Sequence, residues 1–143
     1  MQTKVKNVMT NHPVMIDPET TLKEAAQKME ELDCGILPVG TKDEQEGIIT
    51  DRDIVIRAVS RGKDVNTEKV KDYMTADVCC CSADDTIEQA ADIMRVQNIN
   101  RLLVKDEGDQ ICGIITFGTI VRKTPDTKEK SNAVEHAVKN KAA

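Results

Sequence analysis

The stretch GIITDRD, residues 47–53, decides the fold. Its glycine and two isoleucines are typical of a buried strand, and apolar residues follow at helical spacing from Ile54 to Val59. The pattern predicts a strand that runs directly into the first turn of a helix. Such a corner offers free backbone N–H groups and the positive end of a helix dipole to a bound anion.

The chain contains this corner twice. Residues 113–116 repeat GIIT without change, and residues 70–75 (VKDYMT) match residues 5–10 (VKNVMT). The apolar positions between these motifs also correspond, with one extra residue in a loop of the second copy. Repeated units tend to bury their open faces against their neighbours. We divide the chain into a first repeat, 1–62, a second repeat, 63–124, and a polar C-terminal tail, 125–143.

Each repeat shows the same order of expected elements. In the first, a helix begins after Thr20 or Thr21, with its apolar residues on one stripe, and Gly35 interrupts it. The tail is open to two interpretations: a short helix over 131–141, with Val134, Ala137 and Val138 on one face, or a frayed end. The expected strands are 14–16, 36–39, 78–81 and 102–104, and the expected closing helices are 51–61 and 117–123.

The composition narrows the class of function. Tyr73 and Phe117 are the only aromatic residues, and the net charge is −5, so neither a base-stacking surface nor a nucleic-acid groove is favoured. The chain has no apolar run of membrane-spanning length, and residues 1–6 lack the apolar stretch of a signal peptide. We expect a cytoplasmic protein without nucleic-acid or membrane partners, whose five cysteines are reduced.

Three motifs follow one another along the first repeat: VMT at 8–10, LPV at 37–39, and GIITDRD at 47–53. Together they resemble a pair of cystathionine-beta-synthase (CBS) domains, the arrangement called a Bateman module, and residues 47–53 fit the family pattern Gly-apolar-x-Ser/Thr-x-x-Asp in full. The resemblance covers residues 5–123 and is closest to small, free-standing bacterial modules. It implies an α/β (α+β) fold of two β-α-β-β-α repeats, packed sheet to sheet with pseudo-two-fold symmetry.

The resemblance also implies a function. Many members bind an adenosyl ligand, such as AMP, ADP, ATP, NAD or S-adenosylmethionine, in clefts between the repeats. They pair into a disc-like homodimer and regulate a separate protein, here unknown, without catalysing a reaction. We therefore expect a regulatory module with an adenosyl ligand and no catalytic cofactor.

Asp53 is the main candidate for ligand binding. A carboxylate accepts two hydrogen bonds at once, which suits the two hydroxyls of a ribose, and the resemblance assigns Asp53 this role. The alternative is a solvated acid that the helix dipole stabilises. Thr50 fits a helix N-cap and can also contact a ribose or phosphate oxygen. Arg52 fits either a phosphate clamp or a surface charge.

The resemblance places further candidates just before two of the strands. Backbone groups at Gly35 and Ile36 would meet the adenine edge, although Gly35 also fits a helix C-cap. Arg101, after Asn100, matches a phosphate-contacting arginine, with a plain salt bridge as the alternative. Ile16, in the preceding strand, belongs to the same predicted site.

The second corner departs from the family pattern. Thr119 stands where the first copy has Asp53, although Thr116 is retained. A single hydroxyl cannot offer two charge-assisted hydrogen bonds, so we expect one competent site and one weak or empty site. The predicted ligand residues are Asp53, Thr50, Arg52, Gly35, Ile36, Ile16, Arg101, Asn100, Thr116 and Thr119.

Two other readings stay open. Three consecutive cysteines, residues 79–81, alternate faces in a strand and cannot converge on one metal, so packing is favoured over a redox-responsive protein. The second is a stress-associated interaction protein without a ligand, which the altered second corner favours. His12 and His136 are isolated, and no catalytic or metal-binding arrangement accompanies them.

Overall fold

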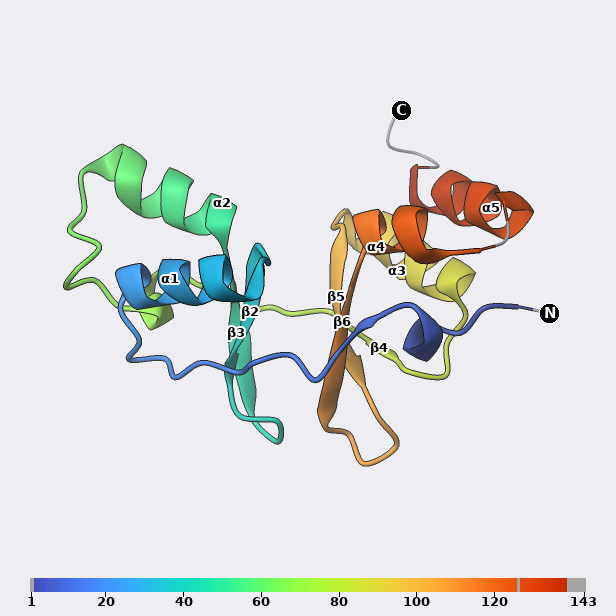
Figure 1. The fold of residues 1–143 in the computed structure, drawn as a ribbon, viewed down its shortest axis with the longest axis horizontal. Coiled ribbons are helices and arrows are strands. Elements are labelled where there is room, and N and C mark those ends of the chain that lie inside the picture. Colours follow the sequence, from blue (N-terminus) through green and yellow to red (C-terminus); the bar gives the residue numbers. More distant parts are fainter. Residues whose placement is uncertain (1, 126, 139–143) are drawn as a thin grey trace. The chain divides into compact units, whose positions relative to one another are not determined.

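The computed structural model describes residues 2–125 and 127–138, which form two compact units (Figure 1). The central unit comprises Val14–Val78, and the terminal unit comprises Met1–Pro13 together with Cys79–Ala143. Both units combine helices with strands, which confirms the predicted α+β class. None of the helices in the described ranges is both long and apolar enough to cross a membrane.

The compact units differ from the sequence repeats, because each unit takes its first helical turn from the other repeat. The turn η1 (Val5–Asn7) belongs to the terminal unit, where the Val5 N–H donates to the Asp85 carbonyl at 2.8 Å. The equivalent turn η4 (Val70–Asp72) belongs to the central unit, where the Val70 N–H donates to the Thr20 carbonyl at 2.8 Å. Val5 and Val70 are fully buried. A three-residue turn cannot bury its own valine, so it packs against a complete helix and sheet.

The central unit is a helix packed beside a two-stranded antiparallel sheet. Thr21 caps the first helix, and its side chain and that of Glu24 form a reciprocal capping box. Ile16 makes only a single parallel bridge to Val39, where the sequence predicted a strand over 14–16. The elements are α1 (Leu22–Leu32), β2 (Ile36–Gly40), β3 (Gln45–Thr50), α2 (Asp51–Asp53), η2 (Ile54–Ala58), η3 (Val59–Arg61) and η4.

The predicted closing helix over 51–61 is present, but only its first turn is α-helical. The segment η2 is π-helical and η3 is a 3₁₀ turn, so the hydrogen-bond spacing changes twice. Gly62 ends the helix in the left-handed conformation, with φ of 68°. Ile54 and Ala58 are buried, which fixes one side of this irregular helix against the unit.

The terminal unit has a four-stranded sheet in the order β1-β6-β5-β4. The β4–β5 pair is parallel, and the other two pairs are antiparallel. Thr86 caps α3 in the same way that Thr21 caps α1. The elements are η1, β1 (Thr10–Asn11), β4 (Cys80–Ser82), α3 (Ile87–Gln97), β5 (Arg101–Lys105), β6 (Ile111–Thr116), α4 (Phe117–Lys123) and α5 (Thr127–Val138).

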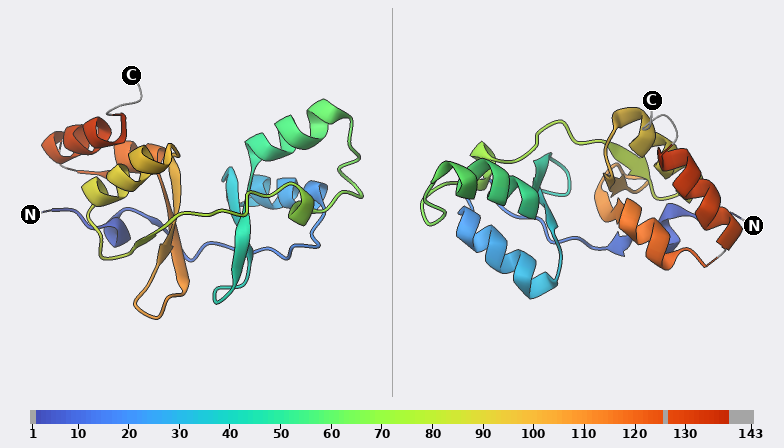
Figure 2. Two further views of the ribbon diagram at one scale, coloured as in Figure 1. Left: turned by 180° about the vertical axis from the view of Figure 1, so that it is seen from behind. Right: turned by 90° about the horizontal axis from the view of Figure 1, so that it is seen from above.

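The tail forms a helix, α5, that packs on α3 and α4 (Figure 2). Ala133 and Ala137 are buried in the core of the terminal unit. Val138 is exposed, so the predicted apolar face is wrong at that residue. The helix also begins before residue 131, while residues 139–141 of the predicted helix lie outside the described residues.

Candidate functional site

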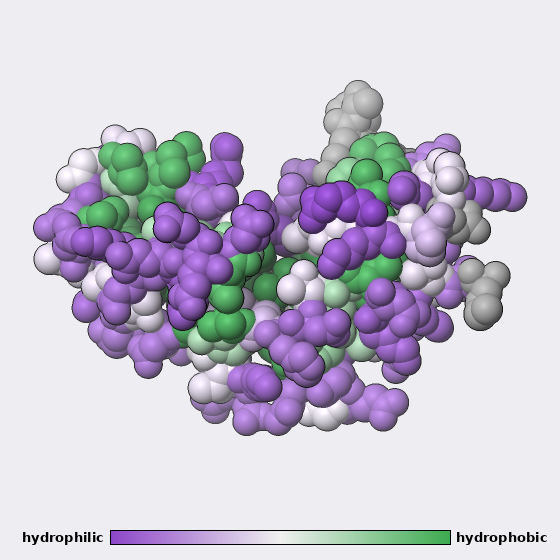
Figure 3. Space-filling model, in the orientation of Figure 1, coloured by the Kyte–Doolittle hydropathy of each residue, from purple (hydrophilic) through white to green (hydrophobic). Residues whose placement is uncertain are grey.

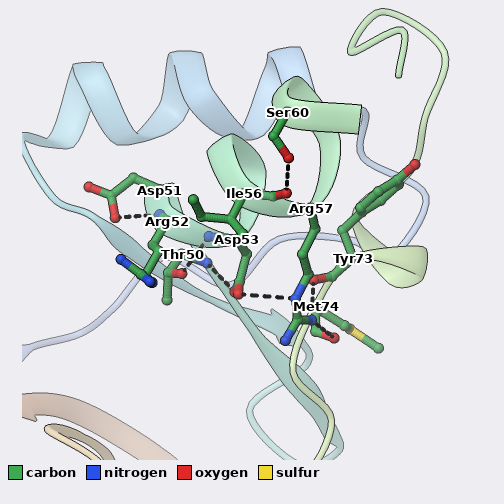
Figure 4. A network of polar contacts seen from close by, with 9 residues as sticks. All are labelled: Thr50, Asp51, Arg52, Asp53, Ile56, Arg57, Ser60, Tyr73 and Met74. Atoms are coloured by element: carbon green, nitrogen blue, oxygen red, sulfur yellow. Dashed lines mark hydrogen bonds and ion pairs between the residues drawn. The ribbon is translucent and has the colours of Figure 1, made fainter. Parts of the chain in front are cut away.

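The candidate site of the central unit is the corner between β3 and α2 (Figure 4). Thr50 is the N-cap of α2, and its Oγ1 accepts a hydrogen bond from the Asp53 N–H at 3.1 Å. The Asp53 carboxylate accepts one from the Thr50 N–H at 3.0 Å. These reciprocal bonds form a capping box that fixes the orientation of the Asp53 side chain.

The backbone N–H groups of this corner are all engaged within the chain. The Asp51 N–H donates to the Gly35 carbonyl at 3.0 Å, and the Arg52 N–H donates to the Asp51 carboxylate at 2.8 Å. With the two bonds of the capping box, residues 50–53 leave no unbonded N–H group. The prediction of free N–H groups is therefore wrong. Carboxylates of the first turn accept from two of these groups, and the Thr50 hydroxyl and the Gly35 carbonyl accept from the other two.

Asp53 is largely buried, with 13% of its side chain exposed. Its Oδ1 lies 3.7 Å from the Nε of Arg57, one helical turn later. Arg57 also donates to the carbonyls of Tyr73 and Met74, at 3.0 and 3.4 Å (Figure 4). A carboxylate has about four lone-pair sites, so these contacts leave Asp53 acceptor capacity.

Arg57 was missed by the sequence reasoning. The signal that could have found it is its spacing of four residues from Asp53, which places the two side chains on one helix face. Arg57 connects the corner to Tyr73 and Met74, which belong to the second sequence repeat. Because of this contact, the orientation of the Asp53 side chain also depends on residues outside the first helical turn.

Gly35 lies against the corner, but it does not cap α1. Asp33 is the C-cap, in the left-handed conformation with φ of 52°. The prediction that Gly35 ends the helix is therefore wrong. A Cβ on Gly35 would lie 2.8 Å from Oδ2 of Asp51, so a larger residue would displace that side chain. Its small size allows the end of α1 to approach the corner closely.

The other predicted residues of the central unit lie along β2. Ile36 begins β2 and pairs with Thr50 across the sheet, so it lies beside the corner. Ile16 is buried and donates its N–H to the Pro38 carbonyl at 3.0 Å, further along the same strand. Arg52 is exposed on the first turn of the helix. The fold thus brings Gly35, Ile36, Thr50, Arg52 and Asp53 together, with Ile16 further along the strand.

The corner of the terminal unit has the same backbone and a different side-chain network. Thr116 caps α4 by accepting from the Thr119 N–H at 3.0 Å, and the two hydroxyl oxygens lie 2.9 Å apart. Thr119 is only 4% exposed. The Phe117 N–H donates to the Asn100 carbonyl at 2.9 Å, as Asp51 does to Gly35 in the other unit. Two hydroxyls here replace a hydroxyl and a carboxylate.

Arg101 and Asn100 lie next to this second corner. Nη1 of Arg101 donates to the Asn100 side-chain oxygen at 3.4 Å. Arg101 begins β5 and pairs with Thr116 across the sheet. The four predicted residues of the terminal unit are therefore also grouped, and the ligand roles of all ten residues stay predictions.

A pocket of about 470 Å³ lies on the helix side of the central corner. Its walls come from the end of α1 and the start of the closing helix, and its polar lining includes Glu30, Asp33 and Asp51. Gly35 is the one predicted ligand residue among the residues that line it. The sequence did not predict that the end of α1 would form a wall of this pocket, because acidic residues on a helix are typical of a solvent-exposed face.

Cys81, the last of the three consecutive cysteines at residues 79–81, does not have the properties of a reactive thiol. Burial raises the pKa of the Cys81 thiol to about 12, with a smaller contribution from the nearby Asp85 carboxylate. Burial likewise raises the pKa of Cys112. Because the thiolate is the reactive form, Cys81 is poorly reactive at neutral pH. Its packing in the core agrees with the predicted structural role.

Comparison with known proteins identifies the family. The CBS domain model matches residues 5–60 and 70–126. The chain belongs to the CBS domain family. It is 30% identical over 116 residues to the CBS domain-containing protein YhcV of Bacillus subtilis, covering 81% of each chain.

Two solved structures are also similar to this CBS domain pair. One is Hypoxic Response Protein I with two coordinated zinc ions (31% identity, TM-score 0.73, 86% of this chain and 100% of that chain); a curated relative of that name is from Mycobacterium tuberculosis. The other is the CBS domain pair of protein MJ0100 in complex with 5′-methylthioadenosine and S-adenosyl-L-methionine (26% identity, TM-score 0.74, 85% and 95%). Within residues 2–125 and 127–138 of this chain, no group of three or more metal-ligating side chains occurs.

Proposed function

We propose that this CBS domain pair is a regulatory module that binds an adenosyl ligand at the Asp53 corner of the central unit. Membership of the family supports the regulatory role. The complex of the MJ0100 domain pair with two adenosyl compounds supports the ligand class. The ligand candidates are AMP, ADP, ATP, NAD, S-adenosylmethionine and methylthioadenosine.

The observation that carries this proposal is the oriented carboxylate of Asp53. The Thr50 N–H holds one oxygen of that carboxylate, and Arg57 lies beside the other. A ribose presents two adjacent hydroxyl donors, and a fixed carboxylate with remaining lone pairs can accept from both. The carboxylate is already desolvated in part, so less water must be displaced when the hydroxyls bind.

The neighbouring residues have roles that follow from their positions. We propose that the backbone of Gly35 and Ile36, with the side chain of Ile16, contacts the adenine. Arg52, exposed on the first turn, would contact a phosphate or another anionic group. In the terminal unit, Asn100, Arg101, Thr116 and Thr119 form a weaker second site, because its hydroxyls bond each other.

Ligand binding would act through the closing helix. Arg57 connects the Asp53 carboxylate to the carbonyls of Tyr73 and Met74. A ribose that competes for Asp53 changes the strength of this connection. A ligand shifts a conformational equilibrium only by its difference in affinity for the two forms. We propose that the form favoured by the ligand is recognised by a separate protein, that the chain works as a homodimer in the cytoplasm, and that it has no catalytic activity of its own.

A thermal-shift screen with the six named compounds tests the proposal. A ligand at 100 times its Kd should raise the Tm by about 5–10 °C, because it binds the native state alone. The key variant is Asp53→Asn, which keeps one oxygen to accept from the Thr50 N–H and loses the charge. It should abolish the ligand-induced shift while changing the ligand-free Tm little.

The matched control is Asp51→Asn, which removes a charge from the same helical turn. It should keep the ligand-induced shift, because Asp51 has no proposed contact with the ribose. A flat screen, or an equal loss of the shift in both variants, would reject the ribose role of Asp53. A flat screen would favour the alternative, an interaction protein without a ligand, which the two-hydroxyl network of the second corner supports. Cys81 gives no support to the redox alternative, because burial raises the pKa of its thiol to about 12.

A further inference from the structure

The closing helix of the central unit changes its hydrogen-bond spacing within η2. The Val59 N–H donates to the carbonyls of both Ile54 and Val55, which lie five and four residues earlier. The first bond has the spacing of a π-helix, and the second has that of an α-helix. Ala58 has φ of −114°, outside the usual α-helical range of about −50° to −90°. This turn is wider than an α-helical turn and holds about one residue more.

The equivalent helix of the terminal unit, α4, is α-helical from Phe117 to Lys123. Counting from the shared GIIT motif, Ile54 and Ala58 correspond to Ile120 and Thr124. The Thr124 N–H donates to the Ile120 carbonyl at 3.2 Å, with the normal spacing of four residues. A GIIT corner therefore leads into a regular helix in one copy, and the wide turn of the other copy is not imposed by the corner.

Arg57 lies inside the wide turn and anchors it to groups outside the turn. Its Nη1 donates to the carbonyls of Tyr73 and Met74, at 3.0 and 3.4 Å. Its Nε lies 3.7 Å from Oδ1 of Asp53, the proposed ribose ligand. The wide turn is thus connected through one side chain to the carboxylate on which ligand binding depends.

The sequence of η2 does not strongly favour the α-helical spacing. Ile54, Val55 and Ile56 are β-branched and lose side-chain freedom in an α-helix. The Ser60 hydroxyl donates to the Ile56 carbonyl, which accepts from the N–H of residue 60 in a regular α-helix. Such a bond to an earlier carbonyl slightly destabilises a helix and often bends it. Both features reduce the free-energy difference between the wide turn and an α-helical turn.

A change of spacing in η2 would alter the exposed surface of the closing helix. Val55, Ile56 and Val59 are 53%, 47% and 57% exposed, and Figure 3 shows hydrophobic surface over this helix. Successive residues of an α-helix are about 100° apart, so removing one residue from the turn rotates Val59 by about 100° relative to Val55. The Gly62 N–H donates to the Val59 carbonyl at 3.1 Å, so the end of the helix would move with it.

We infer that η2 is a two-state turn that responds to Asp53: it is wide in the ligand-free chain and α-helical when a ribose occupies that carboxylate. This inference rests on the proposed function and specifies how the ligand changes the surface. Without ligand, Arg57 is shared between Asp53 and the two carbonyls and keeps the turn wide. A ribose that takes the Asp53 oxygens weakens one of these contacts, and the Val59 N–H then bonds the Val55 carbonyl alone.

Two matched one-residue deletions test whether the turn holds an extra residue. Deletion of Val55 lets the helix adopt α-helical spacing with its end in place, so the Tm should fall by less than about 5 °C. Deletion of Val121, its counterpart in α4, displaces the rest of a regular helix, including the buried Thr124. The Tm should then fall by about 10 °C or more. Similar losses in both variants would overturn the inference.

A second measurement needs no ligand. The ¹³C chemical shift of Ala58 reports its backbone angles, and its φ lies outside the helical range in this structure. Arg57→Met removes the contacts that keep the turn wide, so NMR of the full chain should show the Ala58 signal at a helical chemical shift. Lys123→Met changes the counterpart of Arg57 and should leave the Ala58 signal unchanged. An unchanged Ala58 signal in Arg57→Met would overturn the inference.

The six adenosyl compounds of the thermal-shift screen probe the connection to Asp53. A compound that binds should move the Ala58 signal as Arg57→Met does. The variant that lacks Val55 should bind it about 3- to 10-fold more tightly, because its turn is already in the bound form. Binding that leaves the Ala58 signal unchanged would overturn the inference while the proposed function stands. If none of the six compounds binds, the proposed function fails, and the Arg57→Met spectrum alone decides whether η2 is a two-state turn.

Discussion

The two strand-to-helix corners share the GIIT sequence and differ three residues after its threonine. In the central unit, Thr50 and Asp53 form a reciprocal capping box with a carboxylate. In the terminal unit, Thr116 and Thr119 place two hydroxyls 2.9 Å apart. The helix starts in the same way in both, since each threonine accepts from the N–H three residues later. The comparison shows that capping needs only the threonine, so the carboxylate at Asp53 is not required by the fold.

The largest effect on stability is expected from removing the threonine caps of the two corners, and it should differ between them. Thr116→Val removes the cap of α4 and leaves the hydroxyl of Thr119, 4% exposed, without its partner, so the unfolding free energy should fall by about 2–3 kcal/mol. Thr50→Val removes a cap but leaves the Asp53 carboxylate bonded to the Thr50 N–H, so about 1 kcal/mol should be lost. Urea unfolding of both variants measures the difference. Equal losses would show that the hydroxyl pair has no stabilising role.

The second effect is a dependence of stability on pH that comes from the terminal unit and has no counterpart at the matching position of the central unit. Cys81 and Ile16 hold the same place in the two copies and are both buried, but only Cys81 titrates. Its pKa is raised from 9.0 to about 12 by burial, so its contribution is complete below pH 9 and is lost as the pH rises from 9 towards 12. Between pH 9 and 12 the Cys81 thiol ionises in the unfolded chain while it stays protonated in the folded chain. The stability of wild type should therefore fall more steeply than that of Cys81→Ala, by about 1.4 kcal/mol per pH unit.

Urea unfolding of both proteins at pH 8, 9, 10 and 11 measures this slope. Other groups that titrate in the same range cancel in the difference between the two proteins. Parallel slopes would mean that Cys81 reaches solvent in the folded state. That result would reopen the redox alternative.

The smallest expected effect concerns Arg57 and its counterpart Lys123. Arg57→Met removes two hydrogen bonds to carbonyls and the contact with Asp53, at a side chain that is 43% exposed, so the loss should be about 1 kcal/mol. Lys123→Met changes an exposed residue at the end of α4 and should change stability by less than about 0.5 kcal/mol. Thermal unfolding of the pair tests this. An Arg57→Met variant as stable as Lys123→Met would remove Arg57 from the proposed connection between ligand and closing helix.

The fold was predictable where the signal was periodic or repeated. The sequence predicted the apolar stripe of α1, a cap at Thr20 or Thr21, and the end of the closing helix at Gly62; the structure has the cap at Thr21. These features were predictable because helix caps and left-handed glycines have local chemical causes. The exchange of the turns at Val5 and Val70 between units was not readable, since alignment of repeats shows which segments are alike and not where each one packs.

The sequence predicted which residues lie together at the candidate corner, but not how they bond to one another. The motif placed Thr50 and Asp53 at one strand-to-helix corner, where the structure has them. It could not show that acidic side chains of the same turn would satisfy the N–H groups, because that depends on rotamers. Arg57 was missed because its partners Tyr73 and Met74 lie in the other repeat of the sequence. The helical tail was left open, since its burial at Ala133 depends on the surface that α3 provides.

The most direct test of the account is the binding stoichiometry of the adenosyl compound that gives the largest thermal shift, measured by calorimetry. The account predicts one site per chain, lost in Asp53→Asn and retained in Thr119→Ala. Two equal sites per chain, or binding that survives Asp53→Asn unchanged, would contradict it.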